Sequence, residues 1–174
     1  FHGPQAETGH MAGGVSQLLQ GDGSGQFIPV SPHLSGLVAP GDAKSLTQTD
    51  LDGDGWMDFV LGINNDQIMA FRNNNQTSNR PVIVRLLGKA GNPQAIGSRI
   101  TIHLDNGTTR MAEVRAGAGY LSQSPSDCSF GLAANRTIST IHILWPNGIE
   151  SSVNNPQPLQ MIKVTHPHLS AENR

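Results

Sequence analysis

One segment of nine residues, 50–58, contains the groups of this sequence that are best suited to binding a metal ion. Four carboxylates stand at positions 1, 3, 5 and 9 of residues 50–58, and a backbone carbonyl falls at position 7. A tight loop turns oxygens at these offsets inward, and Ca²⁺ takes six to eight oxygen ligands at roughly 2.3–2.6 Å. Two glycines inside the segment permit the backbone conformations that such curvature needs. We therefore expect a calcium site whose ligands are Asp50, Asp52, Asp54, Asp58 and the carbonyl of Trp56.

This segment differs from the helix-flanked calcium loop of EF-hand proteins. Position 12 of that loop is a bidentate glutamate, whereas position 12 here is Leu61. Leu61 belongs to the apolar run 59–63, which predicts a strand rather than a helix. Mg²⁺ fits less well, because it retains its waters and demands octahedral geometry. The structural alternative is an acidic, glycine-rich turn that binds no ion.

The composition indicates which elements must position this loop. Charged residues make up 14% of the 174 residues, below the usual ~25%, while glycine and proline number 20 and 11. Sustained helical periodicity is nearly absent, so we expect an all-β protein of short strands and tight turns. The net charge is −2 and no basic run is present, which argues against a nucleic-acid partner. No run approaches the ~20 apolar residues needed to cross a bilayer, so we expect no membrane-spanning segment.

Short apolar runs separated by polar turns predict a first unit around the acidic loop. Residues 1–24 read as an irregular lead-in with a short strand near residues 15–19. Residues 25–78 predict a four-stranded antiparallel meander. Its expected strands are residues 26–30, 43–49, 59–63 and 67–72.

A polar run at residues 73–80 has nothing to bury and predicts a linker to a second unit. We expect that unit at residues 79–166, as an antiparallel β-sandwich or barrel-like domain followed by a tail at 167–174. Asn106-Gly107 is a strong hairpin signal, because both residues tolerate the positive φ of a type I′ turn. The expected strands are residues 81–87, 99–104, 108–115, 137–145, 149–153 and 160–165.

The first unit resembles the FG-GAP, or VCBS, repeat of calcium-loaded β-propellers. The resemblance rests on the acidic loop between two strands, the glycine-rich lead-in at residues 23–27 and the closing segment at 70–73. It implies one propeller-type, four-stranded blade whose metal ties two strands together, with residues 15–20 as the last strand of a preceding blade. A propeller needs roughly four to eight blades, and one acidic loop is present. We therefore expect the chain to be the C-terminal part of a longer protein.

The second unit resembles the ASPIC/UnbV module. Four motifs carry the resemblance in order, and together with the first repeat they imply a protein of the cartilage acidic protein-like family. Gly117, Gly119, Trp145 and Pro146 in these motifs have structural explanations, as a bend and as the end of a strand. The motifs are residues 92–100, 115–124, 130–132 and 145–148.

No set of residues in the sequence has the pattern of a catalytic site. His103 and His142 are each isolated in expected strands, and His166 and His168 share one face of an extended segment without a third ligand. Cys128 is the only cysteine and has no base or orienting partner in the sequence pattern. We therefore expect no enzyme activity in this chain.

These observations favour a non-catalytic, calcium-stabilised binding or adhesion module that is extracellular or in the cell envelope. Millimolar calcium outside the cell fills even a weak site. We expect its ligand to be a protein or a glycan. The alternative is an accessory domain of a larger secreted enzyme, such as one directed at glycans, with the catalytic part elsewhere.

Overall fold

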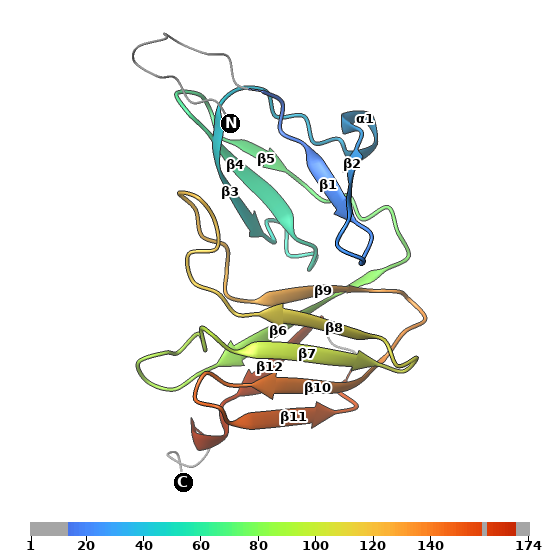
Figure 1. Cartoon of the computed structure of the whole chain (residues 1–174), viewed down its shortest axis with the longest axis vertical. Coiled ribbons are helices and arrows are strands. Elements are labelled where there is room, and N and C mark those ends of the chain that lie inside the picture. The colour runs from blue at the N-terminus through green and yellow to red at the C-terminus, as the bar shows by residue number, and fades with distance from the viewer. Residues whose placement is uncertain (1–13, 158–159, 170–174) are drawn as a thin grey trace.

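The computed structural model describes residues 14–157 and 160–169. The chain is nearly all-β and forms two stacked units, with the N-terminal unit above the C-terminal one in Figure 1. Residues 1–13 of the expected lead-in (1–24) and residues 170–174 of the expected tail (167–174) lie outside the described residues. In the described part of the chain, no helix has the length and hydropathy to cross a membrane.

The N-terminal unit begins with a separate hairpin. Strand β1 (Leu18–Gly21) pairs antiparallel with β2 (Phe27–Val30). The turn between them is held by Asp22, whose Oδ1 accepts the Ser24 N–H at 2.7 Å. A single helical turn, α1 (Pro32–Ser35), follows and ends at Gly36.

A three-stranded antiparallel sheet forms the rest of this unit. It contains β3 (Ala43–Thr49), β4 (Asp58–Ile63) and β5 (Met69–Phe71), with β4 in the middle. The predicted four-stranded meander is therefore wrong in one strand, since β2 pairs with β1 and not with β3. The physical reason is proximity, because a short turn brings β1 beside β2, whereas α1 separates β2 from β3. The buried cluster is correspondingly small: Ala39, Ala43, Leu61 and Ile63.

The C-terminal unit consists of two sheets. One has the order β12-β6-β9, and the other has the order β11-β10-β7-β8. The first contains β6 (Arg80–Leu87), β9 (Cys128–Leu132) and β12 (Met161–Thr165). The second contains β7 (Arg99–Leu104), β8 (Thr109–Glu113), β10 (Ile138–Leu144) and β11 (Glu150–Asn154). A short 3₁₀ turn, η1 (Pro167–Leu169), follows β12.

Two features of this unit differ from the expectation of an antiparallel sandwich or barrel. The first and last strands, β6 and β12, run parallel, with Ile83 opposite Met161 and Leu87 opposite Thr165. The described strands also form two separate sheets and do not close into a barrel. Strand β9, which was not among the expected strands, completes the first sheet beside β6.

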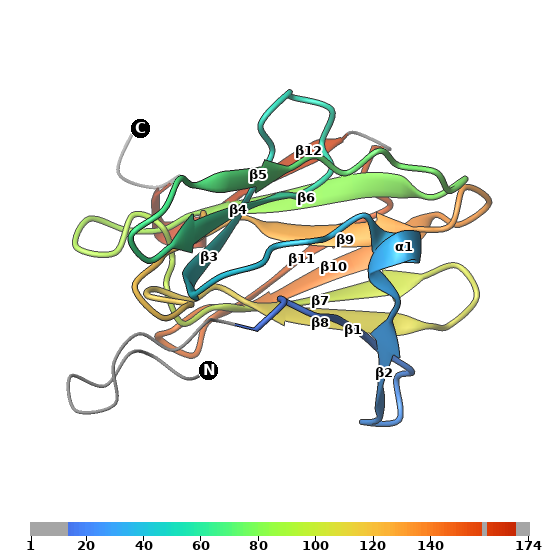
Figure 2. The ribbon, with the colours of Figure 1, turned by 90° about the horizontal axis from the view of Figure 1, so that it is seen from above.

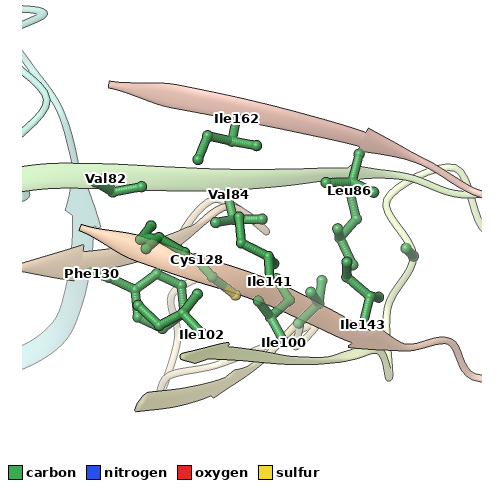
Figure 3. Packing of buried hydrophobic residues seen from close by; sticks show 14 of the residues in the cluster. Val82, Val84, Leu86, Ile100, Ile102, Cys128, Phe130, Ile141, Ile143 and Ile162 are labelled. Atoms are coloured by element: carbon green, nitrogen blue, oxygen red, sulfur yellow. The ribbon is translucent and has the colours of Figure 1, made fainter. Parts of the chain in front are cut away.

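Alternating side chains of the two sheets form the main core (Figure 3). Val82 and Val84 on β6 face inward, as do Ile141 and Ile143 on β10. Burying an aliphatic side chain of this size stabilises the folded state by about 1.5–3 kcal/mol. Trp145, at the end of β10, is 1% exposed, and its Nε1 donates to Ser151 Oγ at 2.7 Å. The C-terminal unit thus supplies a rigid platform for the smaller N-terminal unit.

Hydrogen bonds join the two units through strand β3. Thr47 Oγ1 donates to the carbonyl of Gln123 at 2.8 Å, and the Gln48 N–H donates to Ser124 Oγ at 3.1 Å. Figure 2, seen from above, shows β3, β4 and β5 lying over the sheet that contains β6 and β9. Gln123 and Ser124 therefore contribute to the contact between the units.

Candidate metal centre

The acidic loop connects β3 to β4 and brings three carboxylates together. Asp50, Asp52 and Asp58 each place one carboxylate oxygen within 4.8 Å of the others. Oxygens on opposite sides of a Ca²⁺ ion stand about 5 Å apart, twice the metal–oxygen distance of roughly 2.3–2.6 Å. The spacing of these three groups therefore fits a calcium ion. Among the described residues, no other group of three or more His, Cys, Asp or Glu ligand atoms is this close.

Backbone donors within the loop fix the carboxylate of Asp50. Its Oδ1 accepts the Gly53 N–H at 2.8 Å, and its Oδ2 accepts the Gly55 N–H at 2.9 Å. Both glycines have positive φ, +78° and +86°, which a residue with a side chain adopts at a cost. The two glycines thus curl the chain so that its N–H groups point back at the first aspartate.

Asp58 is the buried member of the group, with 1% of its surface exposed. Its Oδ2 accepts the Leu51 N–H at 2.9 Å, and its Oδ1 accepts the Asn73 N–H at 2.7 Å. A buried carboxylate needs such donors, because burial of an unpaired charge is very unfavourable. Asp58 therefore connects the start of the loop, the first residue of β4 and the segment that follows β5.

The two other expected ligands, Asp54 and Trp56, are not among the three converging carboxylates. Asp54 is exposed, and its Oδ1 accepts the Trp56 N–H at 2.8 Å. The Trp56 side chain packs toward the C-terminal unit, where a Cβ on Gly131 would lie 3.8 Å from its Cζ3. The structure thus gathers Asp50, Asp52 and Asp58, while Asp54 holds the turn that leads into Trp56.

A cation from outside the loop partly balances the acidic group. Arg72 Nε lies 3.1 Å from Asp52 Oδ2, and the arginine side chain is 65% exposed. The sequence analysis did not assign Arg72 to the site. The available signal was the pairing of strands, because Phe71 lies opposite Phe59 and so places the residue after it beside the loop.

The loop also packs on the C-terminal unit. Gly55 is buried, and a Cβ added there would collide with the side chain of Gln160, just before β12. Together with the position of Trp56 over Gly131, this places the acidic loop on the outer face of the β12-β6-β9 sheet. An ion bound in the loop would therefore lie close to the contact between the two units.

The histidines form a second polar cluster, at the end of β12. His166 is 3% exposed and lies edge-on to Trp145, with ring centroids 4.7 Å apart. Its Nδ1 accepts the His168 N–H at 3.2 Å, and His168 Nδ1 lies 3.3 Å from Lys89 Nζ. Burial, followed by the charges of Lys89 and His168, lowers the pKa of His166. His142 pairs instead with Glu150 on the outer face of the other sheet, at 3.3 Å.

Cys128 faces the main core. Burial, and to a lesser extent the charge of Asp127, raises the pKa of its thiol to about 11. A thiol is a weak nucleophile when its pKa is this high, because the thiolate is the reactive form.

Comparison with known proteins gives two findings. Residues 88–171 match the family described as ASPIC and UnbV. The chain is also similar to cartilage acidic protein 1 of Mus musculus, with 25% identity over 124 residues. That match covers 68% of this chain and 19% of the mouse protein, so the chain corresponds to a small part of its relative. The C-terminal unit therefore contains an ASPIC/UnbV domain, which begins at residue 88, directly after β6.

Proposed function

We propose that the chain is a non-catalytic binding module whose two β units are clamped together by Ca²⁺. The observation that supports this most strongly is the convergence of Asp50, Asp52 and Asp58 in a loop that packs on the ASPIC/UnbV domain. The N-terminal unit serves as one FG-GAP/VCBS-type repeat, and its fourth strand comes from elsewhere in the full-length protein.

The three converging carboxylates would hold the ion, and the exposed carboxylate of Asp54 and the carbonyl of Trp56 are near enough in sequence to join them. Bound Ca²⁺ supplies positive charge that relieves the repulsion between these acids. It would also hold residues 55 and 56 in the conformation that contacts Gln160 and Gly131. In this role the ion stabilises an arrangement of domains and takes no part in a reaction.

We place the module outside the cytosol. Arg72 already provides part of the charge that an ion would provide, which favours a weak site. Weak calcium modules, with dissociation constants of about 10⁻⁴–10⁻³ M, are filled outside cells. The name of the mouse relative, a cartilage protein, supports the same location.

Thermal unfolding with calcium and with a chelator tests the clamp. At 100 times its dissociation constant, Ca²⁺ stabilises the folded state by about 2.7 kcal/mol. For a chain of this size that raises the melting temperature by roughly 5–10 °C. Asp52→Ala should abolish the rise. The matched control is Asp66→Ala, which removes an exposed aspartate outside the loop and should leave the rise intact.

Calorimetric titration provides the decisive measurement. The proposal requires saturable binding of one calcium ion to the wild-type chain and its loss in Asp52→Ala. Absence of calcium binding by the folded wild-type chain at millimolar concentration would rule the clamp out. Mg²⁺ should give a smaller shift at equal concentration, because its octahedral demand fits a flexible loop poorly.

A further inference from the structure

A cleft of about 340 Å³ with a mixed polar and apolar lining lies where the acidic loop meets the β12-β6-β9 sheet. Thr49, Asp50 and Met57 line it from the N-terminal unit, and Arg85 and Asp127 line it from the C-terminal unit. Its volume falls at the lower end of the range of about 300–1,000 Å³ that small-ligand sites occupy. The cleft exists only because the two units are in contact.

An ion pair in the cleft is already ordered without a ligand. Arg85 Nε donates to Asp127 Oδ1 at 2.8 Å, and Arg85 Nη2 donates to Asp127 Oδ2 at 2.5 Å. The arginine side chain is 42% exposed and the aspartate side chain is 15% exposed. A guanidinium carries five N–H donors, and a carboxylate can accept about four hydrogen bonds. The pair therefore retains donors and acceptors for a ligand and needs little reordering to use them.

Hydroxyl groups stand on both sides of this pair. Ser124 Oγ accepts the Gln48 N–H at 3.1 Å and keeps its own proton to donate. Ser129 lines the cleft from β9 with an exposed side chain, and Thr49 lines it from the end of β3. Each hydroxyl is both a donor and an acceptor. The cleft thus offers donors and acceptors together, and the apolar part of its lining is formed by Met57, Ile83, Pro125 and Met161.

The charges of the residues that line the cleft determine which class of polar ligand fits it best. The ionisable residues that line the cleft are Asp50, Arg85 and Asp127, with a summed charge of −1. An anionic ligand would meet an arginine that already has its carboxylate partner in Asp127. A cationic ligand would compete with Arg85 for Asp127. A neutral ligand rich in hydroxyl groups satisfies the donors and acceptors of the cleft without adding charge.

We propose that this cleft between the two units binds a neutral saccharide of one or two sugar rings. The proposal rests on the proposed function as a binding module and names the chemical class of its ligand. Asp50 belongs to both the acidic cluster and the cleft, so saccharide and calcium should each strengthen the binding of the other. Such coupling is reciprocal, because it is a free energy shared between the two sites.

Two-dimensional NMR titration of the whole chain tests this proposal. The probes are cellobiose, xylobiose, mannobiose, lactose and N,N′-diacetylchitobiose, with digalacturonate as the anionic arm. At least one neutral disaccharide should shift the amide signals of Ser129 and Asp127 in a saturable way. Affinity should fall when calcium is replaced by a chelator.

Three variants locate the site. Arg85→Gln should weaken binding at least about tenfold, since hydrogen bonds to charged groups contribute about 1.5–3 kcal/mol. The matched control is Arg115→Gln, which breaks the exposed ion pair with Glu113 on the other sheet and should leave binding within about twofold. Ser129→Trp should block the cleft without touching the ion pair, because Ser129 is an exposed residue of an edge strand.

The outcomes separate this proposal from the calcium clamp. If calcium raises the melting temperature but no neutral disaccharide binds, the cleft proposal is wrong and the clamp stands. If a neutral disaccharide binds and calcium changes neither the melting temperature nor the affinity, the clamp and its coupling to the cleft are wrong, and the cleft stands as a saccharide site alone. Binding of digalacturonate alone, or undiminished binding in folded Ser129→Trp, would also overturn the cleft proposal.

Discussion

The carboxylate of Asp58 accepts the backbone N–H of Asn73 at 2.7 Å, across the three-stranded sheet of the N-terminal unit. The acidic loop is therefore tied to the segment that leads into the ASPIC/UnbV domain, and the bond exists without a metal ion. One side chain connects the candidate metal centre with the link between the two units.

Asp58→Ala should destabilise the chain even in the presence of chelator. The substitution removes the charged acceptor of the Leu51 and Asn73 N–H groups, and a hydrogen bond to a charged group contributes about 1.5–3 kcal/mol. Urea unfolding should show a loss of about 2–5 kcal/mol, whereas Asp66→Ala should stay within about 0.5 kcal/mol. A small loss in Asp58→Ala would mean that Asp58 acts only through the metal.

Arg72→Gln should raise the affinity for calcium. The guanidinium lies 3.1 Å from Asp52 Oδ2 and opposes a second cation there, although its 65% exposure screens the effect. An interaction of about 0.5–1 kcal/mol is reasonable at this exposure and corresponds to a twofold to fivefold gain. Calorimetric titration measures it, with the exposed Arg110→Gln as the control. A lower affinity would show instead that Arg72 orders Asp52 for the ion.

Gly88→Ala should destabilise the ASPIC/UnbV domain by several kcal/mol. An added Cβ would collide with the carbonyl oxygen of Asn92 and lie 2.9 Å from the backbone nitrogen of Ala95. Backbone atoms cannot move aside as a flexible side chain can. Gly131→Ala is the control in the same domain, because its Cβ would meet only Trp56, at an ordinary 3.8 Å. Circular dichroism melting curves of the two variants compare them directly.

Stability should fall as the pH drops below about 6.5, the ordinary pKa of histidine. Burial, Lys89 and His168 lower the pKa of His166 in the folded state, so the unfolded chain binds the proton more readily. The contribution of His166 is complete above the unfolded pKa and is lost as the pH falls toward the folded pKa. Urea unfolding between pH 8 and pH 5 should show this slope, with a shallower slope in His166→Gln. His33→Gln should retain the wild-type slope, and an unchanged slope in His166→Gln would assign the pH dependence to another group.

Alternation and turn chemistry made much of the fold predictable from the sequence. The expected strands at residues 43–49 and 99–104 have the observed bounds of β3 and β7. In β7, Ile100, Ile102 and Leu104 alternate with polar residues, so one face of the strand is buried and the other is not. Gly107 has the expected positive φ of +81°, but Asn106 does not have the positive φ that a type I′ turn requires, so the predicted turn type is wrong.

The elements that were not predicted depend on contacts between distant parts of the chain. Strand β9 does alternate, with Cys128, Phe130 and Leu132 buried, but serine and glycine between them resemble a loop. The parallel pairing of β6 with β12 leaves no local signal, since about 80 residues separate the strands. Hairpin signals predict pairing only between strands that are adjacent in the sequence.

The clustering of carboxylates in the acidic loop could be predicted because they lie within nine residues. The groups around it could not, because Arg72, Gln160 and Gly131 come from three other places in the sequence. Asp54 has the spacing of a ligand, yet its carboxylate accepts a backbone N–H in its own turn. The spacing of the carboxylates along the sequence therefore indicates which of them can reach one ion. Their other hydrogen-bond partners depend on the fold and cannot be read from the spacing.

The parallel pairing of β6 with β12 determines when the C-terminal unit can finish folding during its synthesis. Because the first strand of the domain pairs with its last, the β12-β6-β9 sheet cannot be completed until the ribosome has released nearly all of the domain. Contacts between residues so far apart in sequence also slow folding, because a long loop must close before they form. Until β12 arrives, one edge of β6 stays open to other chains, so a chaperone that shields exposed strand edges would act on this protein during its synthesis.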